Sequence, residues 1–397
     1  MWEKVTYAAT QAGSFEQAAR DLWKLAELDI SDQRARRAAL HIGQERVTLR
    51  DAESAAYAAL SLPARRTSPV DQVPQVACVQ MDGGRLQIRE RGADAAQPAS
   101  DGCWREMKAG CCLSMVSEVS AADPCPQLPE MFVDPGRMAQ LAREIKGFSA
   151  DAAAEESPPP EAEPPPDEEP TERPGRPHPL ARSVIATRRS VEEFGPLLAA
   201  AAWARGFATA LRKAFVADGS EANWGVWRKY FSDYVPILDF IHALCYVYAA
   251  ALAGRAAEEG FRIYRKWAQW MWSGQVDLII AALVERQQEL GAPAEDESET
   301  SPRVQVAKTL GYLQNQRQRM RYDEYRRQGL PITSSYVEST VKQINRRMKG
   351  TEKFWSQGAE PMLTLVADHL SDTPVLHRFW RDRHARLTGL RCYHQAA

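Results

Sequence analysis

Three carboxylates that lie far apart in the chain have the residue type and local setting of metal ligands: Asp82 in VQMDGGRLQ, Asp218 in VADGS and Glu338 in SSYVEST. Mg²⁺ prefers such oxygen ligands and keeps exchangeable waters. Two ions held about 3.5–4 Å apart by shared carboxylates can activate an attacking oxygen and stabilise the leaving oxygen of an in-line displacement. This chemistry requires a fold that brings the three acids together.

Each acid also has a local interpretation that needs no metal. Ser335 and Glu338 have the spacing of a capping box, in which the two side chains satisfy backbone N–H groups at a helix start. Glu338 can also pair with Lys342 one turn further on. Asp82 and Asp218 both precede glycine and suit turns. Both interpretations stay open at this level, and the elements around the acids must decide between them.

Strands are expected before the first two acids. The stretch PQVACVQMDGGRLQIRERG has β character on both sides of Asp82, and Asp-Gly is a strong hairpin signal. Residues 103–119 can supply a third antiparallel strand. After a helical pattern over 190–213, KAFVADGS predicts a strand ending at Asp218, NWGVWRKYFSDY a helix and VPILDF a strand ending at Asp239. Such a βαβ unit places acids at the carboxyl ends of parallel strands.

The remainder of the C-terminal half is predicted to be helical. Residues 241–290 and 304–328 have helical patterns, and the helix that carries Glu338 has an apolar stripe at Val337, Val341, Ile344 and Met348. Three antiparallel strands, a βαβ unit and a late helix resemble the order of elements in RNase H-like nucleases. We therefore expect an α/β fold whose core brings Asp82, Asp218 and Glu338 together.

The first 60 residues predict a separate helical region. SFEQAARDLWKLAEL forms an amphipathic helix, a turn follows, and Ser31 is a suitable N-cap for a second helix with Arg34, Arg36 and Arg37 in its first turns. This pattern suits a helix-turn-helix that presents its second helix to a DNA major groove. A plain helical hairpin has the same pattern and remains an alternative.

The charge is unevenly distributed along the 397 residues. Residues 150–179 contain nine acids, two arginines and ten prolines, and this composition predicts a linker that cannot form a core. The net charge of −2 therefore divides into −7 for this segment and +5 for the rest. From Ser301 onward, seventeen Lys or Arg stand against eight Asp or Glu. A basic C-terminal third fits a polyanionic partner, although a solvated charged surface gives the same composition.

Composition also constrains the compartment. The seven cysteines form no C-x-x-C pair and no cluster with histidine, so we expect free thiols in a reducing cytoplasm. The first residues lack the apolar segment of a signal peptide, and no apolar run has membrane-spanning length. We therefore expect a soluble, cytoplasmic protein, with no membrane partner.

Several motifs together resemble the DDE transposases of bacterial insertion sequences, of the ISKra type and related to the Mutator-like supergroup. They are VQMDGGRLQIR, CWREMKAG, VADGS, ILDFIHAL and GLPITSSYVESTVKQINRRMKG followed by FWSQGAE, in the family's order. The resemblance implies an RNase H-like catalytic domain over 74–397, interrupted by the 150–179 linker and an all-helical insertion over 243–328. Asp239 and His242 match the family's C/D-x-x-H signature, which makes Asp218 the second catalytic acid and gives Asp239 and His242 supporting roles; a packed histidine is the alternative for His242.

The implied activity is transposition: cleavage of DNA at the element ends and strand transfer by metal-dependent phosphoryl transfer. Asp82, Asp218 and Glu338 would be the catalytic residues and would hold two Mg²⁺ ions, with Mn²⁺ as a substitute. The expected partners are the terminal repeats and the target DNA, bound by a homo-oligomer associated with the bacterial nucleoid. A domesticated DNA-binding protein without catalysis and an RNase H-like nuclease remain alternatives. Besides the three arginines near Ser31, the residues expected to contact DNA are Arg346, Arg347, Lys349, Arg317, Arg319 and Arg321.

Overall fold

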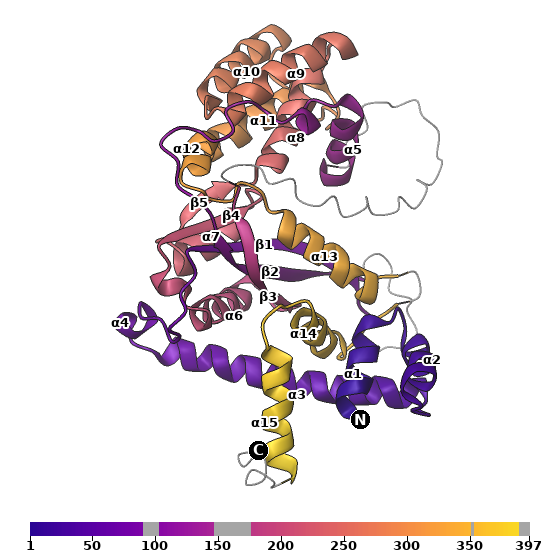
Figure 1. Ribbon diagram of the computed structural model, residues 1–397. Helices are drawn as coiled ribbons and strands as arrows, with labels where there is room; N and C mark the ends of the chain where they lie inside the picture. The colour runs from indigo at the N-terminus through magenta and orange to yellow at the C-terminus, as the bar shows by residue number, and fades with distance from the viewer. Residues whose placement is uncertain (90–102, 147–175, 351–352, 389–397) are drawn as a thin grey trace.

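A five-stranded mixed sheet forms the centre of the computed structural model, which describes residues 1–89, 103–146, 176–350 and 353–388 (Figure 1). The strands lie in the order β3-β2-β1-β4-β5. β1 (Val76–Gln87), β2 (Trp104–Val116) and β3 (His178–Thr187) pair antiparallel. β4 (Arg212–Ala217) and β5 (Val235–Leu238) extend the sheet in parallel with β1. The protein is thus a mixed α/β protein, as predicted.

The hairpin predicted at Asp82-Gly83-Gly84 is wrong. β1 continues through these residues, which pair in register with Lys108 and its neighbours on β2. The neighbouring strand supplies partners for the backbone groups on both sides of the glycines, so the chain does not turn there. Gly84 instead permits close packing, because a Cβ at this position would lie 2.6 Å from Met107 Cε and 3.4 Å from Val341 Cγ1. Helix α13 (Ser335–Met348) packs on β1 and β2 at this place.

The third strand of the antiparallel set differs from the prediction. The chain was expected to form two strands around Asp82 and a third over 103–119, whereas the third strand is β3. β3 begins at His178, inside the segment predicted to be a linker, so that the prediction for His178 and Pro179 is wrong. Pairing with β2 determines this strand, and the pairing partner is distant in sequence. The rest of the predicted linker, up to residue 175, lies outside the described residues.

The predicted βαβ unit is confirmed. α6 (Val191–Ala204) leads through a short turn, η2 (Phe207–Thr209), into β4, and α7 (Glu221–Tyr230) connects β4 to β5. β4 and β5 are fully buried at their carboxyl ends, as their apolar sequences require. Asp218 and Asp239 therefore follow directly on two neighbouring parallel strands.

A helical body lies beyond the carboxyl ends of β4 and β5, at the top of Figure 1. It contains α8 (Phe240–Leu252), α9 (Ala257–Trp272), α10 (Val276–Leu290), α11 (Pro302–Gln316), η3 (Arg317–Arg319) and α12 (Tyr322–Arg327), which confirms the predicted helical content of 243–328. η1 (Glu130–Phe132) and α5 (Pro135–Lys146) join it from the segment after β2. Phe240 makes edge contacts with the rings of Phe132, Trp272 and Tyr322 and so ties the body to the end of β5.

The N-terminal helices pack on α6 and α14 (Ala359–His369), next to the β3 edge of the sheet (Figure 1). They are α1 (Trp2–Gln11), α2 (Phe15–Ala26), α3 (Asp32–Ala59) and α4 (Leu62–Arg65), and Ser31 caps α3 as predicted. α3 contacts α6 and α14, and α15 (Val375–Thr388) follows α14. On α3, the buried Arg46 forms two hydrogen bonds with the carboxylate of Asp368. The helical region of residues 1–60 thus shares a buried interface with the sheet and its covering helices.

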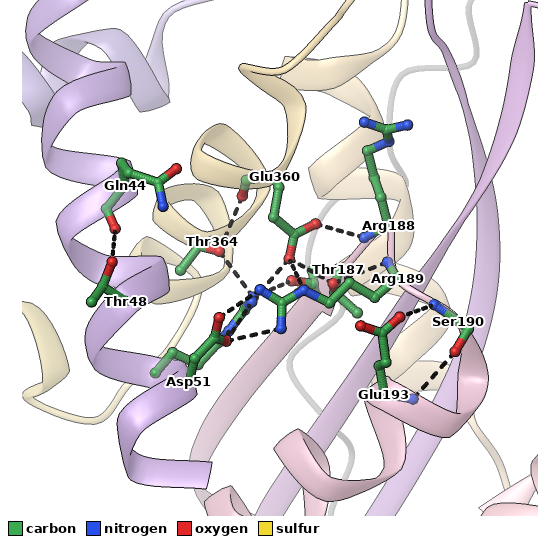
Figure 2. Close-up of polar contacts among 12 residues, drawn as sticks. Gln44, Thr48, Asp51, Thr187, Arg188, Arg189, Ser190, Glu193, Glu360 and Thr364 are labelled. Carbon is green, nitrogen blue, oxygen red and sulfur yellow. Dashed lines mark hydrogen bonds and ion pairs between the residues drawn. The ribbon is translucent and has the colours of Figure 1, made fainter. Parts of the chain in front are cut away.

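A second ionic contact fixes α3 to β3 and α14 (Figure 2). The Glu360 carboxylate accepts hydrogen bonds from Thr187 Oγ1 at 2.6 Å, from the Arg188 backbone N–H at 2.8 Å and from Arg50 Nη2 at 3.0 Å. Asp51 pairs with both Arg50 and Arg189. These residues come from α3, the end of β3 and α14, and hold the three elements together. Among the described residues, no helix combines the length and apolar character needed to cross a membrane.

Candidate metal centre

Asp82 lies on the face of the sheet that α13 covers. On the same face, two residues earlier, the buried Gln80 accepts a hydrogen bond from the Val337 backbone N–H at 3.1 Å and donates one to the Thr333 carbonyl at 2.9 Å. Gln80 thereby adds a side-chain hydrogen bond at the start of α13, where the Val337 N–H also bonds the Ser334 carbonyl and the N-cap side chain makes no such bond. This side chain fixes the first turn of α13 next to the strand that carries Asp82.

Asp218 lies level with Asp82 on the neighbouring strand. The parallel register pairs Gln80 with Val216, and each acid follows its member of that pair by two residues. Asp218 Oδ1 accepts hydrogen bonds from the Ser220 backbone N–H at 3.0 Å and from Asn223 Nδ2 at 2.8 Å. Both hydrogen bonds go to Oδ1, and neither Ser220 nor Asn223 bonds Oδ2.

The turn after Asp218 is held in place by α11. Gly219 has φ of +97°, a conformation that favours glycine, and a Cβ there would lie 2.9 Å from the Tyr312 ring. Tyr312 Oη donates to the Asp218 carbonyl at 2.7 Å, and Gln316 Nε2 donates to the Gly219 carbonyl at 3.1 Å. The helical body therefore fixes the backbone at the second acid.

Glu338 lies in the first turn of α13, but the capping box predicted with Ser335 is absent. The N-cap residue is Ser334, which has no side-chain hydrogen bond to the helix backbone. Its Oγ instead lies 2.7 Å from Glu338 Oε1 and 2.9 Å from Asp239 Oδ2. The helix begins one residue earlier than the box requires, because Gln80 bonds its first turn. Glu338 is therefore free of a capping role.

Asp239 and His242 form a buried pair beside Glu338. Asp239 is fully buried, and its carboxylate accepts hydrogen bonds from His242 N (2.6 Å), His242 Nδ1 (2.9 Å), Ser334 N (2.5 Å) and Ser334 Oγ (2.9 Å). Burial opposes ionisation of Asp239, but the hydrogen bonds and charge of His242 outweigh it and lower the pKa. Although burial alone would lower it, the pKa of His242 rises to about 9 because of Asp239, Glu338 and Asp218. His242 is thus an imidazolium at neutral pH.

The charges of Asp218 and Glu338 influence the ionisation of Asp82. Burial, followed by the charges of Asp218 and Glu338, raises the pKa of Asp82 to about 6, although the Gly83 backbone N–H and His242 oppose the rise. Burial and the charge of Asp239 likewise raise the pKa of Glu338. Carboxylates that repel one another in a partly buried site are stabilised in their ionised form by a bound cation.

Among the described residues, one group has its ligand atoms close enough together to hold a cation. Ligand atoms of Asp239, His242 and Glu338 lie within 4.8 Å of one another. In that set, Asp239 already accepts four hydrogen bonds, two from His242 and two from Ser334. Asp82 and Asp218 lie outside this group. All three predicted acids are half-buried, and the charges of Asp218 and Glu338 raise the pKa of Asp82. A metal site at Asp82, Asp218 and Glu338 therefore stays a prediction.

The residues expected to bind DNA differ in their surroundings. Arg347 is 5% exposed, its Nε donates to the Ala9 carbonyl, and its guanidinium lies against the rings of Phe15 and Trp355. Burial lowers its pKa to about 10. The prediction that Arg347 contacts phosphates is wrong, because it lies on the apolar side of α13. The exposed members of the set are Arg34, Arg36, Arg37, Arg317, Arg321, Arg346 and Lys349, while Arg319 is half-buried.

Two positioning residues, Gln80 and Ser334, were not identified from the sequence. Gln80 lies two residues before Asp82 in a strand of apolar residues, and a polar side chain in a strand buried on both faces is the signal that could have indicated it. Ser334 gave no such signal because Ser335 suited the cap equally well. Comparison with models of protein families gave no match, and a search among curated proteins found no relative.

Proposed function

We propose that the protein is a metal-dependent DNA transposase of the DDE type with an RNase H-like core. The observation that carries the proposal is the placement of Asp82, Asp218 and Glu338 on β1, after β4 and on α13, where Asp218 and Glu338 both raise the pKa of Asp82. The sheet order β3-β2-β1-β4-β5, with its first three strands antiparallel, supports such a core.

The three carboxylates would hold two Mg²⁺ ions, which supply the Lewis acidity for phosphodiester cleavage and strand transfer. Asp239 and His242 would support them without binding metal. The imidazolium Nδ1 lies 3.7 Å from Glu338 Oε1, so its charge offsets part of the repulsion among the acids. Ser334 Oγ lies between Asp239 and Glu338 and fixes the orientation of the Glu338 carboxylate.

DNA contacts are proposed for exposed basic residues on two surfaces. Arg346 and Lys349 lie on the same helix as Glu338 and can contact phosphates near the cleavage site. Arg34, Arg36 and Arg37 are exposed at the start of α3, as a helix that enters a major groove requires.

The test is a cleavage assay on a plasmid that carries this gene with its own flanking DNA. We expect Mg²⁺-dependent nicks that leave a 3′-hydroxyl, followed by joined products. Asp82→Asn, Asp218→Asn and Glu338→Gln should each abolish cleavage and retain DNA binding. Glu258→Gln, which removes an exposed carboxylate in the helical body, is the matched control and should cleave normally. Binding without cleavage would favour a DNA-binding protein, and nicks without joining would favour a nuclease.

A further inference from the structure

A cavity of about 450 Å³ opens beside β5, and none of the three acids lines it. Trp227, Pro236, Gln318, Arg319 and Arg321 line it, and these residues come from α7, β5 and the segment around η3. This volume falls in the range of about 300–1,000 Å³ that is typical of small-molecule sites. The lining has two arginines, an amide and an indole, and contains no carboxylate.

The Arg319 guanidinium lies over two indole rings, of which Trp227 lines the cavity and Trp224 is buried. The Arg319 guanidinium is 4.3 Å from the ring centre of Trp224 and 5.9 Å from that of Trp227. Its Nη1 donates to the neutral Gln316 Oε1 at 2.7 Å, so this contact leaves its charge uncompensated. Nucleobases stack on indole rings and guanidinium planes regardless of sequence, and phosphates pair with arginine.

The cavity is linked to the candidate metal centre through one side chain. Gln316 accepts from Arg319 and donates to the Gly219 carbonyl, next to Asp218. Of the nearby carboxylates, Glu221 pairs with Arg228, and Glu324 pairs with Arg321, one of the two arginines that line the cavity. A strand bound at the acids could therefore extend toward the cavity without meeting an unpaired carboxylate from either residue.

We propose that this cavity binds one unpaired nucleotide of a DNA strand, with its base stacked on Trp227 and its phosphate paired with Arg319. That this strand is the one next to the scissile phosphate rests on the proposed transposase function. The preference for a base is independent of cleavage and can be measured without metal.

The experiment measures the anisotropy of fluorescein-labelled octathymidylate with the full chain in EDTA, against an abasic octamer of the same charge. We expect the base-containing strand to bind about 5- to 100-fold more tightly, the range that corresponds to stacking of a base on an aromatic side chain. Trp227→Leu and Arg319→Gln should reduce this ratio to below about twofold. Lys229→Gln removes an exposed charge on the same helix and should leave the ratio unchanged.

Cross-linking supplies a second measurement that needs no variant, since Trp227 Nε1 also bonds the Tyr234 carbonyl and its loss could disturb folding. A 5-iodouracil octamer should cross-link to residues 224–236 or 316–322 upon irradiation. Three outcomes would each overturn the inference. The two octamers could bind with equal affinity, or the cross-links could form elsewhere in the chain. Free thymidine monophosphate could also displace the labelled strand as effectively as the octamer does. Intact base preference without Mg²⁺-dependent cleavage would overturn only the proposed function.

Discussion

Replacement of Asp239 by Asn removes the negative charge of the buried Asp239–His242 pair and keeps the shape of the side chain. Asparagine is also a good N-cap, so α8 keeps an acceptor for the His242 backbone N–H. The amide, however, places a donor against either His242 Nδ1 or the two donors of Ser334. The variant therefore loses the ion pair while the volume of the side chain is unchanged.

The size of the effect follows from the histidine. Its pKa rises from the ordinary 6.5 to about 9 in the folded protein, with Asp239 as the main raising influence. At 1.36 kcal/mol per pKa unit, this rise corresponds to roughly 3 kcal/mol of folding free energy. A raised pKa stabilises the fold fully below pH 6.5, and the contribution is lost as pH rises through 9. Because Glu338 and Asp218 also raise this pKa, Asp239→Asn should cost at most about 3 kcal/mol at pH 6, and this pH-dependent part should vanish above pH 9.

Urea denaturation followed by tryptophan fluorescence, in EDTA at pH 6.0, 7.5 and 9.5, measures this difference. Asp233→Asn is the control, because Asp233 is an exposed acid paired with Lys213 and should cost at most about 1 kcal/mol with little change over this pH range. A cost for Asp239→Asn that is the same at pH 6.0 and 9.5 would refute the assignment of His242 as the buried cation. In the cleavage assay, Asp239→Asn should slow the reaction without changing the Mg²⁺ concentration for half activity, whereas Asp218→Asn should remove metal-dependent activity.

Three further predictions concern other contacts. Glu360→Gln should destabilise the protein by about 2–4 kcal/mol and speed hydrogen exchange in α3, because it removes one of the two carboxylates that pair with the buried Arg50; unchanged exchange would contradict the role of this pair. The double variant Arg346→Gln with Lys349→Gln should lower the slope of log K against log salt by about 2, whereas Arg347→Met should leave that slope unchanged. Because the pKa of Asp82 is about 6, Mg²⁺ should raise the unfolding temperature more at pH 7.5 than at pH 5.0, and equal shifts would count against Asp82 as a ligand.

The sequence predicted most elements around the candidate site because their signals are local. The strands before Asp218 and Asp239 are short apolar runs that end in an acid, and the structure has both. The helices of the body and the cap at Ser31 were likewise predictable from periodicity and from one side chain.

The failures arose where a distant partner determines the local structure. Asp82-Gly83-Gly84 has the residues of a turn, but β2 pairs along its whole length and keeps it extended. β3 pairs with β2 across a long intervening segment, and its short alternating pattern follows a proline-rich stretch. Arg347 is at the same helix end as two exposed basic residues, and only the packing of Phe15 and Trp355 distinguishes it from them. Each of these depends on contacts that sequence spacing does not encode.

The contact of Arg347 with Ala9 has a consequence for how a transposase of this build would choose its cutting position. Arg347 lies on the same helix as Glu338, and Ala9 lies on α1, which packs on α3 with its exposed arginines. Among the residues named, packed helices connect Glu338 to the exposed arginines of α3 without a flexible linker between them. The protein would then act as a molecular ruler: the number of base pairs between the recognised sequence and the broken bond would be constant, and a spacer inserted into the DNA would move the cut by its own length.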